Sequence, residues 1–359
     1  MNILVVDDSS LFRLAITDLV KQIPGVTKVK TAANGKMAMD ILVTNEIDIT
    51  ILDVEMPVMD GIEVLRKIKS ENINTKALMF SNLTEKGAEK TIEALNLGAI
   101  DFVTKVAEGE GSGMDAIKDT LIPKIEGLLR LSGHSIEVKS AKENTDNNHA
   151  QAPQRTITKK TELKPNVHLY NVPRVLCIGS STGGPEALSE VFKNLHGPFN
   201  FPILLAQHMP KFFTKKLADH LNSISSVTVK EAEAGEVLKN NVCYIAPGDF
   251  HMTVEKKGAD LVVGINQDEK VCFVRPSVDV LFWSVQKLAL PHVAAIILTG
   301  MGQDGKDGCL SLAETGAPIV IQDQASSVVW GMPGAVAETG IQSLEEDLQG
   351  IYSFINRLK

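Results

Sequence analysis

The stretch CIGSSTGGPEAL, residues 177–188, contains the junction on which the fold of the C-terminal half depends. A short apolar run, RVLCIG, leads into two serines, a threonine, two glycines and a proline, and a helix-like segment follows. Small residues at a strand-to-helix junction allow a sharp turn. The stretch is compatible with two kinds of site: an exposed serine nucleophile, or a glycine-rich loop that binds a phosphate. The surrounding sequence distinguishes them.

Apolar, strand-like runs recur on both sides of this junction. In the second half of the chain they cover residues 172–179, 201–208, 241–246, 293–300 and 318–323, and in the first half 2–7, 27–32, 48–53, 76–81 and 100–105. Helix-like segments such as 10–23, 61–70 and 278–290 lie between them, and 251–265 has the pattern of a β-hairpin with KKGAD as its turn. This alternation predicts an α/β protein with two doubly wound parallel sheets.

A polar segment separates the two halves. Residues 133–170 are rich in Lys, Glu, Asn, Gln, Thr and Pro and contain few large apolar residues. Such a segment buries too little surface to offset the entropy of ordering it. We therefore predict a domain at 1–130, a flexible linker at 131–170 and a second domain at 171–359.

The bulk composition excludes several classes of protein. A net charge of −8 argues against nucleic-acid binding. The N-terminus has no secretory signal and no apolar run approaches the length of a membrane span, so we expect a cytoplasmic protein without membrane insertion. The cysteines are far apart and form no CxxC pair, so we expect reduced core residues and neither a disulfide nor a zinc site: Cys177, Cys243, Cys272 and Cys309.

Acidic residues follow the strands of the first domain at one predicted edge. Asp7 and Asp8 end the first strand, Asp53 the third, Ser81 the fourth and Lys105 the fifth. Working residues gather at the carboxyl ends of parallel strands, so these side chains should lie together. Three carboxylates in one place suit Mg²⁺, and a metal with a lysine would let Asp53 attack a phosphoryl group.

The first domain resembles a response-regulator receiver domain. The resemblance rests on VVDDS (5–9), LDVEMPVMDG (52–61), FSNLT (80–84) and GAIDFVTK (98–105), and it implies a flavodoxin-like fold. It further implies that a histidine kinase phosphorylates Asp53, with Mg²⁺ held by Asp7, Asp8, Asp53 and the backbone carbonyl of Glu55. Lys105 would pair with the phosphoryl group, Ser81 would move toward it, and Phe102 occupies the aromatic switch position.

In the second domain, three residues leave neighbouring predicted strands. G-x-S-x-G centres on Ser181, His208 follows a strand in LLAQHMP, and Asp304 follows IILTG in LTGMGQDG. A nucleophilic serine needs a base, and the base needs an orienting acid. Taken singly, Ser181 could be a helix N-cap, His208 a strand-end histidine and Asp304 a turn residue. The phosphate-loop alternative lacks a Walker A lysine and a GxGxxG fingerprint.

Residues from about 170 onward resemble the catalytic domain of the chemotaxis protein-glutamate methylesterase (CheB) family. The motifs are IGSSTGGPEAL (178–188), AQHMP (206–210), IAPGDFHM (245–252), RPSVDVLF (275–282), LTGMGQDG (298–305) and WGMPGAV (330–336). The resemblance implies a Rossmann-like methylesterase domain with a β-hairpin. It implies Ser181 as nucleophile, His208 as base and Asp304 as orienting acid, with the N–H groups of Met301 and Thr182 as oxyanion donors.

The implied substrates are glutamate γ-methyl esters and certain glutamines on chemoreceptors. We expect no cofactor in the esterase domain, no direct membrane insertion and a monomeric protein. The unphosphorylated receiver should cover the catalytic site, and phosphorylation of Asp53 should loosen that contact. Two alternatives are a phosphorylation-gated binding protein without catalysis and a transcription regulator. The second predicts a basic helix-turn-helix, which does not fit the 15 Lys/Arg, 20 Asp/Glu and strand-rich pattern of residues 171–359.

Overall fold

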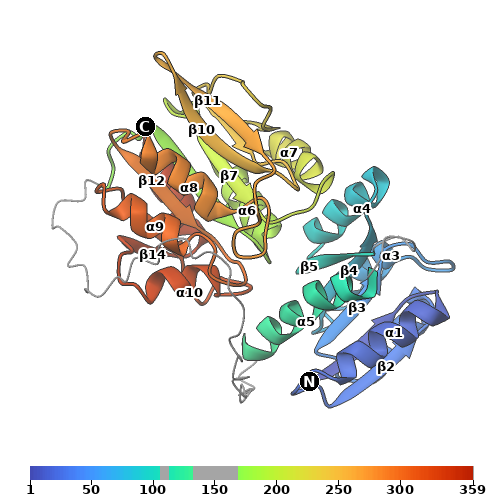
Figure 1. Ribbon diagram of the computed structural model, residues 1–359. Helices are drawn as coiled ribbons and strands as arrows, with labels where there is room; N and C mark the ends of the chain where they lie inside the picture. The colour runs from blue at the N-terminus through green and yellow to red at the C-terminus, as the bar shows by residue number, and fades with distance from the viewer. Residues whose placement is uncertain (106–112, 132–168, 359) are drawn as a thin grey trace, which may run out of the picture.

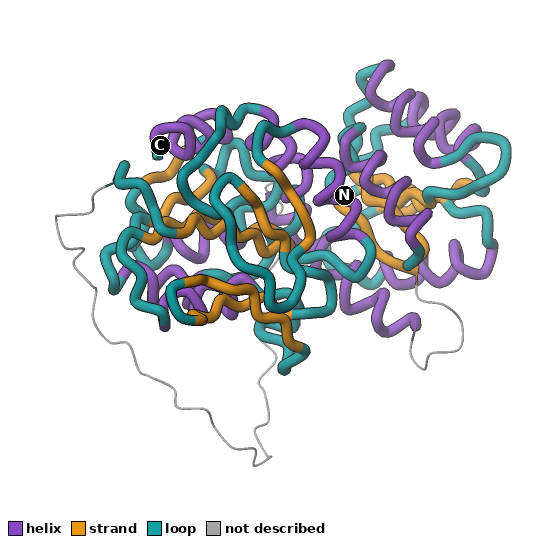
Figure 2. The backbone as a smooth tube through the Cα atoms, turned by 90° about the horizontal axis from the view of Figure 1, so that it is seen from above, coloured by secondary structure: helices purple, strands orange, loops and turns teal. Residues whose placement is uncertain are grey.

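The computed structural model describes residues 1–105, 113–131 and 169–358. They form two α/β units, blue to green and yellow-green to red in Figure 1, each with a central parallel sheet. Figure 2 shows the two units next to each other, with helices around the strands of each. Two parallel-sheet units and one hairpin are the predicted fold class, which is confirmed.

The N-terminal sheet has five parallel strands in the order β2-β1-β3-β4-β5. The direction of winding changes at β1, so the carboxyl ends of β1 and β3 border a crevice. The strands are β1 (Asn2–Val6), β2 (Lys28–Ala32), β3 (Ile49–Asp53), β4 (Lys76–Asn82) and β5 (Asp101–Lys105). The helices are α1 (Ser10–Lys21), α2 (Gly35–Thr44), α3 (Gly61–Ser70), α4 (Glu85–Asn96) and α5 (Gly113–Leu131).

The second sheet has seven parallel strands in the order β14-β13-β12-β6-β7-β9-β8. The strands are β6 (Val175–Ser180), β7 (Ile203–Gln207), β8 (Thr228–Glu231), β9 (Val242–Ile245), β12 (Val293–Ile297), β13 (Ile319–Gln322) and β14 (Leu344–Glu346). The helices are α6 (Gly184–Lys193), α7 (Phe213–Ile224), α8 (Val278–Lys287), α9 (Lys306–Ala313), α10 (Met332–Ala337) and α11 (Leu348–Arg357). Here the winding changes at β6, whose neighbours are β7 and β12.

The predicted hairpin is an antiparallel pair, β10 (His251–Lys257) and β11 (Asp260–Asn266). Its turn is tighter than predicted, because Lys257 already pairs with Asp260 and leaves only Gly258 and Ala259 in the loop. Strands β8 and β14 were not predicted from the sequence. Both are short strands at the two edges of the sheet, and their sequences TVKE and LEE lack a continuous apolar run.

The predicted linker, residues 131–170, lies outside the described residues except at its ends, and α5 continues through Leu131. The expectation that all four cysteines are core residues was wrong for Cys272, which is exposed, whereas Cys177, Cys243 and Cys309 are buried and all four are free. In the part of the chain that the structure describes, no helix is long and apolar enough to cross a membrane.

Candidate active site and receiver site

Ser181, His208 and Asp304 lie at one edge of the second sheet. Ser181 follows β6, His208 follows β7, and Asp304 lies in the loop between β12 and α9. These three strands are adjacent and parallel, in the order β12-β6-β7. Because parallel strands end at the same edge, residues 27 and 123 positions from Ser181 in the sequence come together there.

The turn after β6 is as sharp as its sequence suggested. Gly183 is the N-cap of α6 and has φ +76°, a backbone conformation that side chains rarely adopt. A Cβ at Gly184 would lie 2.1 Å from Oε1 of Gln207, so only glycine fits beside that side chain. The glycines therefore allow a buried glutamine to pack directly under the turn that carries Ser181.

His208 and Asp304 form the closest pair of the site. His208 Nε2 lies 2.7 Å from Asp304 Oδ2, and both side chains are largely buried. If Nε2 carries the proton and donates it to Asp304, the second ring nitrogen, Nδ1, is left with a free lone pair. Nδ1 is thus the nitrogen that can accept a proton from a nucleophile.

Asp304 is held by the start of helix α8. Its Oδ1 accepts from Ser277 Oγ (2.8 Å) and the N–H of Asp279 (3.1 Å), and its Oδ2 accepts from the N–H of Val278 (2.6 Å). Burial alone would raise the pKa of Asp304. The hydrogen bond to His208 and the two backbone N–H groups outweigh burial and hold that pKa below its ordinary value. Asp304 therefore remains a carboxylate beside the histidine.

One contact of the expected triad is not formed. Within the described residues, Ser181 Oγ makes no hydrogen bond, including none to His208. The backbones of these two residues are nevertheless linked, because the side-chain amide of Gln207 donates to Ser181 O (2.9 Å) and His208 O (3.3 Å). Catalytic hydrogen bonds often tighten only when substrate is bound.

Gln207 and Ser277 are site residues that the sequence analysis did not identify. Gln207 is 1% exposed and also accepts from Ser180 Oγ at 2.6 Å, so it joins β6 and β7 beneath the serine. Ser277 is both the N-cap of α8 and a donor to Asp304. Their signals were present, since Gln207 precedes His208 in AQHMP and Ser277 lies in RPSVDVLF, but only the tertiary contacts reveal what they hold.

The two expected oxyanion donors lie next to Ser181. Thr182 follows it directly, and Met301 follows Gly300, whose Cβ position would be 2.9 Å from Ser181 Cβ. Among the described residues, neither the Thr182 N–H nor the Met301 N–H donates a hydrogen bond to another protein group. Both N–H groups therefore keep their hydrogen-bonding capacity unused within the described protein.

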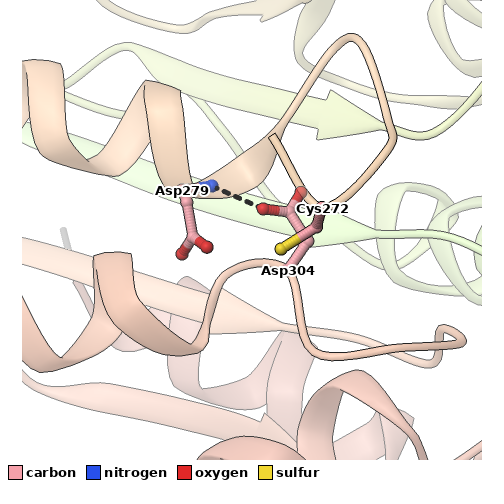
Figure 3. A group of neighbouring side chains, drawn as sticks. All are labelled: Cys272, Asp279 and Asp304. Carbon is pink, nitrogen blue, oxygen red and sulfur yellow. Dashed lines mark hydrogen bonds between the residues drawn. The ribbon is translucent and has the colours of Figure 1, made fainter. Parts of the chain in front are cut away.

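Asp304 also belongs to a group with Cys272 and Asp279, which Figure 3 shows. One oxygen of each aspartate and the sulfur of Cys272 lie within 4.8 Å of one another. The oxygens of Asp304, however, already accept three hydrogen bonds from α8 and its cap and contact His208. We do not interpret this group as a metal centre, because its main carboxylate has its acceptor capacity in use.

The acidic cluster of the first unit is also assembled. Carboxylate oxygens of Asp7, Asp8 and Asp53 lie within 4.8 Å of one another. Lys105 Nζ is 2.7 Å from Asp7 Oδ2 and 2.8 Å from Asp53 Oδ2. Burial raises the pKa of Asp53 to about 6, although the Lys105 charge opposes this rise. An oxygen-only cluster of this charge matches the donors that Mg²⁺ prefers.

The side chains of Ser81, Glu55 and Phe102 make contacts outside the acidic cluster. The hydroxyl of Ser81 donates to the backbone carbonyl of Gly87 in α4 (3.1 Å). The carboxylate of Glu55 pairs with Lys90 at 2.8 Å, so only its backbone is available to the acidic cluster. Phe102 is buried and stacks on Phe213 of α7, with ring centroids 4.3 Å apart and planes at 9°. Phe102 therefore contacts the second unit directly.

Strand β5 of the first unit contacts the loop that carries Ser181. Thr182 Oγ1 donates to Asp101 Oδ2 at 2.6 Å, and the N–H of Gly183 donates to the carbonyl of Ile100 at 3.2 Å. Asp101 is also paired with Lys124 of α5. Met301 packs near Gly127 of the same helix. The first unit thus covers both candidate oxyanion residues, and α4 and α5 lie between the units in Figure 1.

The fold and the two clusters define a class of protein: a receiver domain packed on an output domain that carries a hydrolase-like serine, histidine and aspartate. The sequence matches the family of the CheB methylesterase over residues 176–355 and the response regulator receiver domain over residues 3–111. The chain belongs to the CheB methylesterase family.

Several known proteins are similar to the chain. A protein-glutamate methylesterase/protein-glutamine glutaminase 1 from Rhodospirillum rubrum is 37% identical over 374 residues, covering 99% of this chain and 95% of the relative. A protein of the same name, without a number, from Nocardioides sp. is 40% identical over 343 residues, covering 95% and 90%. The crystal structure of the Thermotoga maritima CheB methylesterase catalytic domain matches with 38% identity and a TM-score of 0.50, covering 52% of this chain and 99% of that one.

Proposed function

We propose that this protein is a cytoplasmic protein-glutamate methylesterase that also deamidates certain glutamines, acting on chemoreceptors in chemotaxis adaptation. The observation that carries the proposal is the 2.7 Å contact between His208 and Asp304 at the sheet edge that also presents Ser181. The names of the relatives over the full chain support both activities.

The reaction begins with transfer of the Ser181 proton to His208 Nδ1. Ser181 Oγ then attacks the ester carbonyl, and Asp304 stabilises the imidazolium through Nε2–H. The N–H groups of Thr182 and Met301 donate to the oxyanion; loss of one such donor typically costs about 10²–10³ in rate. The tetrahedral intermediate collapses when His208 returns the proton to the methoxy oxygen, and methanol leaves.

The second half of the reaction uses the same residues. His208 takes a proton from water, the resulting nucleophile attacks the acyl-enzyme, and Ser181 regains its proton as the glutamate is released. A glutamine side chain reacts in the same way, with ammonia as the first product. All the side chains used in these reaction steps are described residues of the second domain.

The first domain regulates the second in this proposal. A chemotaxis histidine kinase donates a phosphoryl group to Asp53. Mg²⁺, held by Asp7, Asp8, Asp53 and the backbone carbonyl of Glu55, would offset the charge of the phosphoryl oxygens. Lys105 pairs with the same phosphoryl group. The cluster geometry and its oxygen donors support this assignment.

Phosphorylation is expected to reach the catalytic site through β4 and β5. Ser81 gives up its bond to Gly87 and turns toward the phosphorylated Asp53, and Phe102 leaves its stack on Phe213. Asp101 then no longer holds Thr182. The supporting observation is that three consecutive β5-side residues, Ile100 to Phe102, all contact the second domain.

Methanol release from methylated receptor membranes tests the proposal. Wild type, Ser181→Ala and Asp53→Asn should be compared with and without acetyl phosphate. We expect acetyl phosphate to accelerate wild type, Asp53→Asn to keep only the unstimulated rate, and Ser181→Ala to release none. Turnover by Ser181→Ala would show that another residue is the nucleophile, and a wild type that incorporates phosphate but releases no methanol would favour a phosphorylation-gated binding protein.

A further inference from the structure

Helices α8 and α9 cap each other with buried aspartates. Asp304 lies just before α9 and accepts hydrogen bonds from the N–H groups of Val278 and Asp279 in the first turn of α8. Asp279 lies in α8 and accepts from the N–H of Gly308 in the first turn of α9, at 2.7 Å. Figure 3 shows the hydrogen bond from the Asp279 N–H to the Asp304 carboxylate. Each helix therefore supplies the acid that the N-terminus of the other needs.

The two helices approach too closely for this arrangement to shift easily. A Cβ at Gly308 would lie 2.7 Å from Phe282 Cβ and 3.1 Å from Asp279 Oδ1. Asp279 and Asp304 are each only 2% exposed. The position of Asp304 relative to His208 is consequently set by the contact between α8 and α9, in which the Asp279 carboxyl is the direct polar link.

The two carboxyl groups are not equivalent. Asp304 has three donors from α8 and its cap and a fourth partner in His208, whereas Asp279 has one backbone donor, Gly308. Two buried carboxylates this close cannot both be charged without a large cost. Burial, and then the charge of Asp304, raise the pKa of Asp279 to about 8. The site thus favours a charged Asp304 and a neutral Asp279 at pH 7.

Other titratable groups surround the pair and leave this order unchanged. Those facing it from neighbouring elements are Asp307 and Lys306 at the start of α9, Cys309 in α9, Cys272 in the preceding loop, His208 after β7 and His251 at the start of β10. The fixed positive charges near the pair are Lys306, which lies on the same turn as the negative Asp307, and Arg275, which precedes α8 and pairs with Asp249 at 2.9 Å. Among the described residues, each of these positive charges is thus matched by a nearby carboxylate.

We propose that Asp279 is a positioning residue for the esterase reaction: as a neutral acid it ties α9 to α8 and leaves Asp304 as the single carboxylate beside His208. The inference rests on the proposed function and extends it. When Asp279 loses its proton at alkaline pH, a second negative charge appears next to Asp304 and repels it. Activity should therefore fall on the alkaline side, because displacement of Asp304 loosens its contact with His208.

Two substitutions separate charge from shape. Asp279→Asn keeps an oxygen for the Gly308 N–H and stays neutral at every pH, whereas Asp279→Ala removes the acceptor. Asp260→Asn is the matched control for loss of one carboxylate, because Asp260 is exposed at the start of β11 and belongs to the same domain. Methanol release by the full chain, stimulated with acetyl phosphate, should be measured for all four proteins from pH 6 to 9.5.

We expect Asp279→Ala to lower kcat/KM by about 10–100-fold, because a small displacement of a catalytic group has effects of this size. Asp279→Asn should stay within about threefold of wild type at pH 7 and lose the decline that wild type and Asp260→Asn show above about pH 8. If Asp279→Asn and Asp279→Ala lose activity alike, or if Asp279→Asn keeps the wild-type alkaline decline, the proposal is wrong.

A second readout does not depend on activity. Both tryptophans, Trp283 and Trp330, lie in the second unit, and Trp283 lies in α8 itself, so fluorescence of the full chain follows unfolding of this unit alone. When folding raises the pKa of an acid, the folded protein loses stability as the pH rises from the ordinary pKa of that acid to the raised one. The urea midpoint of wild type should fall relative to Asp279→Asn between about pH 5 and 8.

Methanol release and the urea midpoint together distinguish failure of the esterase function from failure of the inference about Asp279. Parallel midpoints of wild type and Asp279→Asn across this range would show that Asp279 is charged in the folded protein and would overturn the inference. A wild type that releases no methanol, with diverging midpoints, would overturn the esterase function and the role of Asp279 in it, while the location of the proton would stand.

Discussion

The hydroxyl of Thr182 donates a hydrogen bond to Asp101 across the boundary between the two domains, at 2.6 Å. Thr182 directly follows Ser181, and Asp101 is the first residue of β5, the strand that ends in Lys105 beside Asp53. A single strand therefore connects the acidic cluster of one domain to the nucleophile loop of the other.

Loss of this bond should release the catalytic site without phosphorylation. A hydrogen bond to a charged group contributes about 1.5–3 kcal/mol, and each 1.4 kcal/mol is a factor of ten in the equilibrium between covered and open sites. Asp101→Ala should raise unphosphorylated methanol release about tenfold or more, and acetyl phosphate should add less than it does to wild type. The measurement is methanol release with and without acetyl phosphate.

The control for Asp101→Ala is Asp18→Ala, which removes an exposed carboxylate from α1. Asp18→Ala should behave as wild type. Unchanged basal activity in Asp101→Ala, with intact phosphorylation of Asp53, would mean that the bond to Thr182 does not restrain the site.

Gln207 should be required to align Ser181 with His208. Gln207→Glu keeps the shape but loses the N–H donors to the carbonyls of both residues and places a charge where only 1% of the side chain is exposed. We expect kcat to fall about 10–100-fold, because catalytic geometry is sensitive to displacements of about 1 Å. Gln303→Glu, at an exposed glutamine near Asp304, is the comparison, and equal activities of the two variants would contradict the prediction.

Asp304 should contribute both to the catalytic rate and to the stability of the fold at acid pH. Asp304→Asn should lower kcat by about 10³–10⁴, as loss of the orienting acid does in other serine hydrolases. Because the folded protein holds the pKa of Asp304 below its ordinary value, the carboxylate stabilises the fold above that ordinary value, and this contribution is lost as pH falls through the lowered pKa.

The check on Asp304 is the urea midpoint followed by tryptophan fluorescence between about pH 2 and 6. Wild type should lose more stability than Asp304→Asn as the pH falls. The same slope in both proteins would indicate that Asp304 has an unshifted pKa in the folded state.

Removal of divalent metal should abolish the stimulation of the esterase by phosphorylation but leave the unstimulated esterase activity unchanged. EDTA should abolish phosphate incorporation at Asp53 and the stimulation by acetyl phosphate, since the cluster of Asp7, Asp8 and Asp53 supplies the metal ligands. Unstimulated methanol release should remain, and added Mg²⁺ should restore stimulation. Loss of the basal rate with EDTA would place a metal in the catalytic domain, and persistent stimulation would remove Mg²⁺ from the mechanism.

The local sequence was sufficient for the alternation of strands and helices, for the family and for the residues at the strand ends. Continuous apolar runs identify strands buried in a parallel sheet, and such strands end at a common edge, so Ser181, His208 and Asp304 could be grouped before any contact was known. The same logic grouped Asp7, Asp8 and Asp53. It failed for β8 and β14, because an edge strand does not need the continuous apolar pattern of a central one.

Other properties depend on segments that are distant in sequence and could only come from the tertiary structure. No periodicity reveals that the Gln207 amide donates to two backbone carbonyls or that Ser277 and the first turn of α8 donate to Asp304. Nor does it reveal that Asp279 accepts from the first turn of α9. The same holds for Asp101 and Thr182, which are separated by 81 positions. The sequence by itself determined which chemical groups the chain carries and the edge at which each strand delivers them. The packing of helices and domains decided which groups are paired, charged or covered, because burial and hydrogen bonding depend on neighbours that the linear order does not specify.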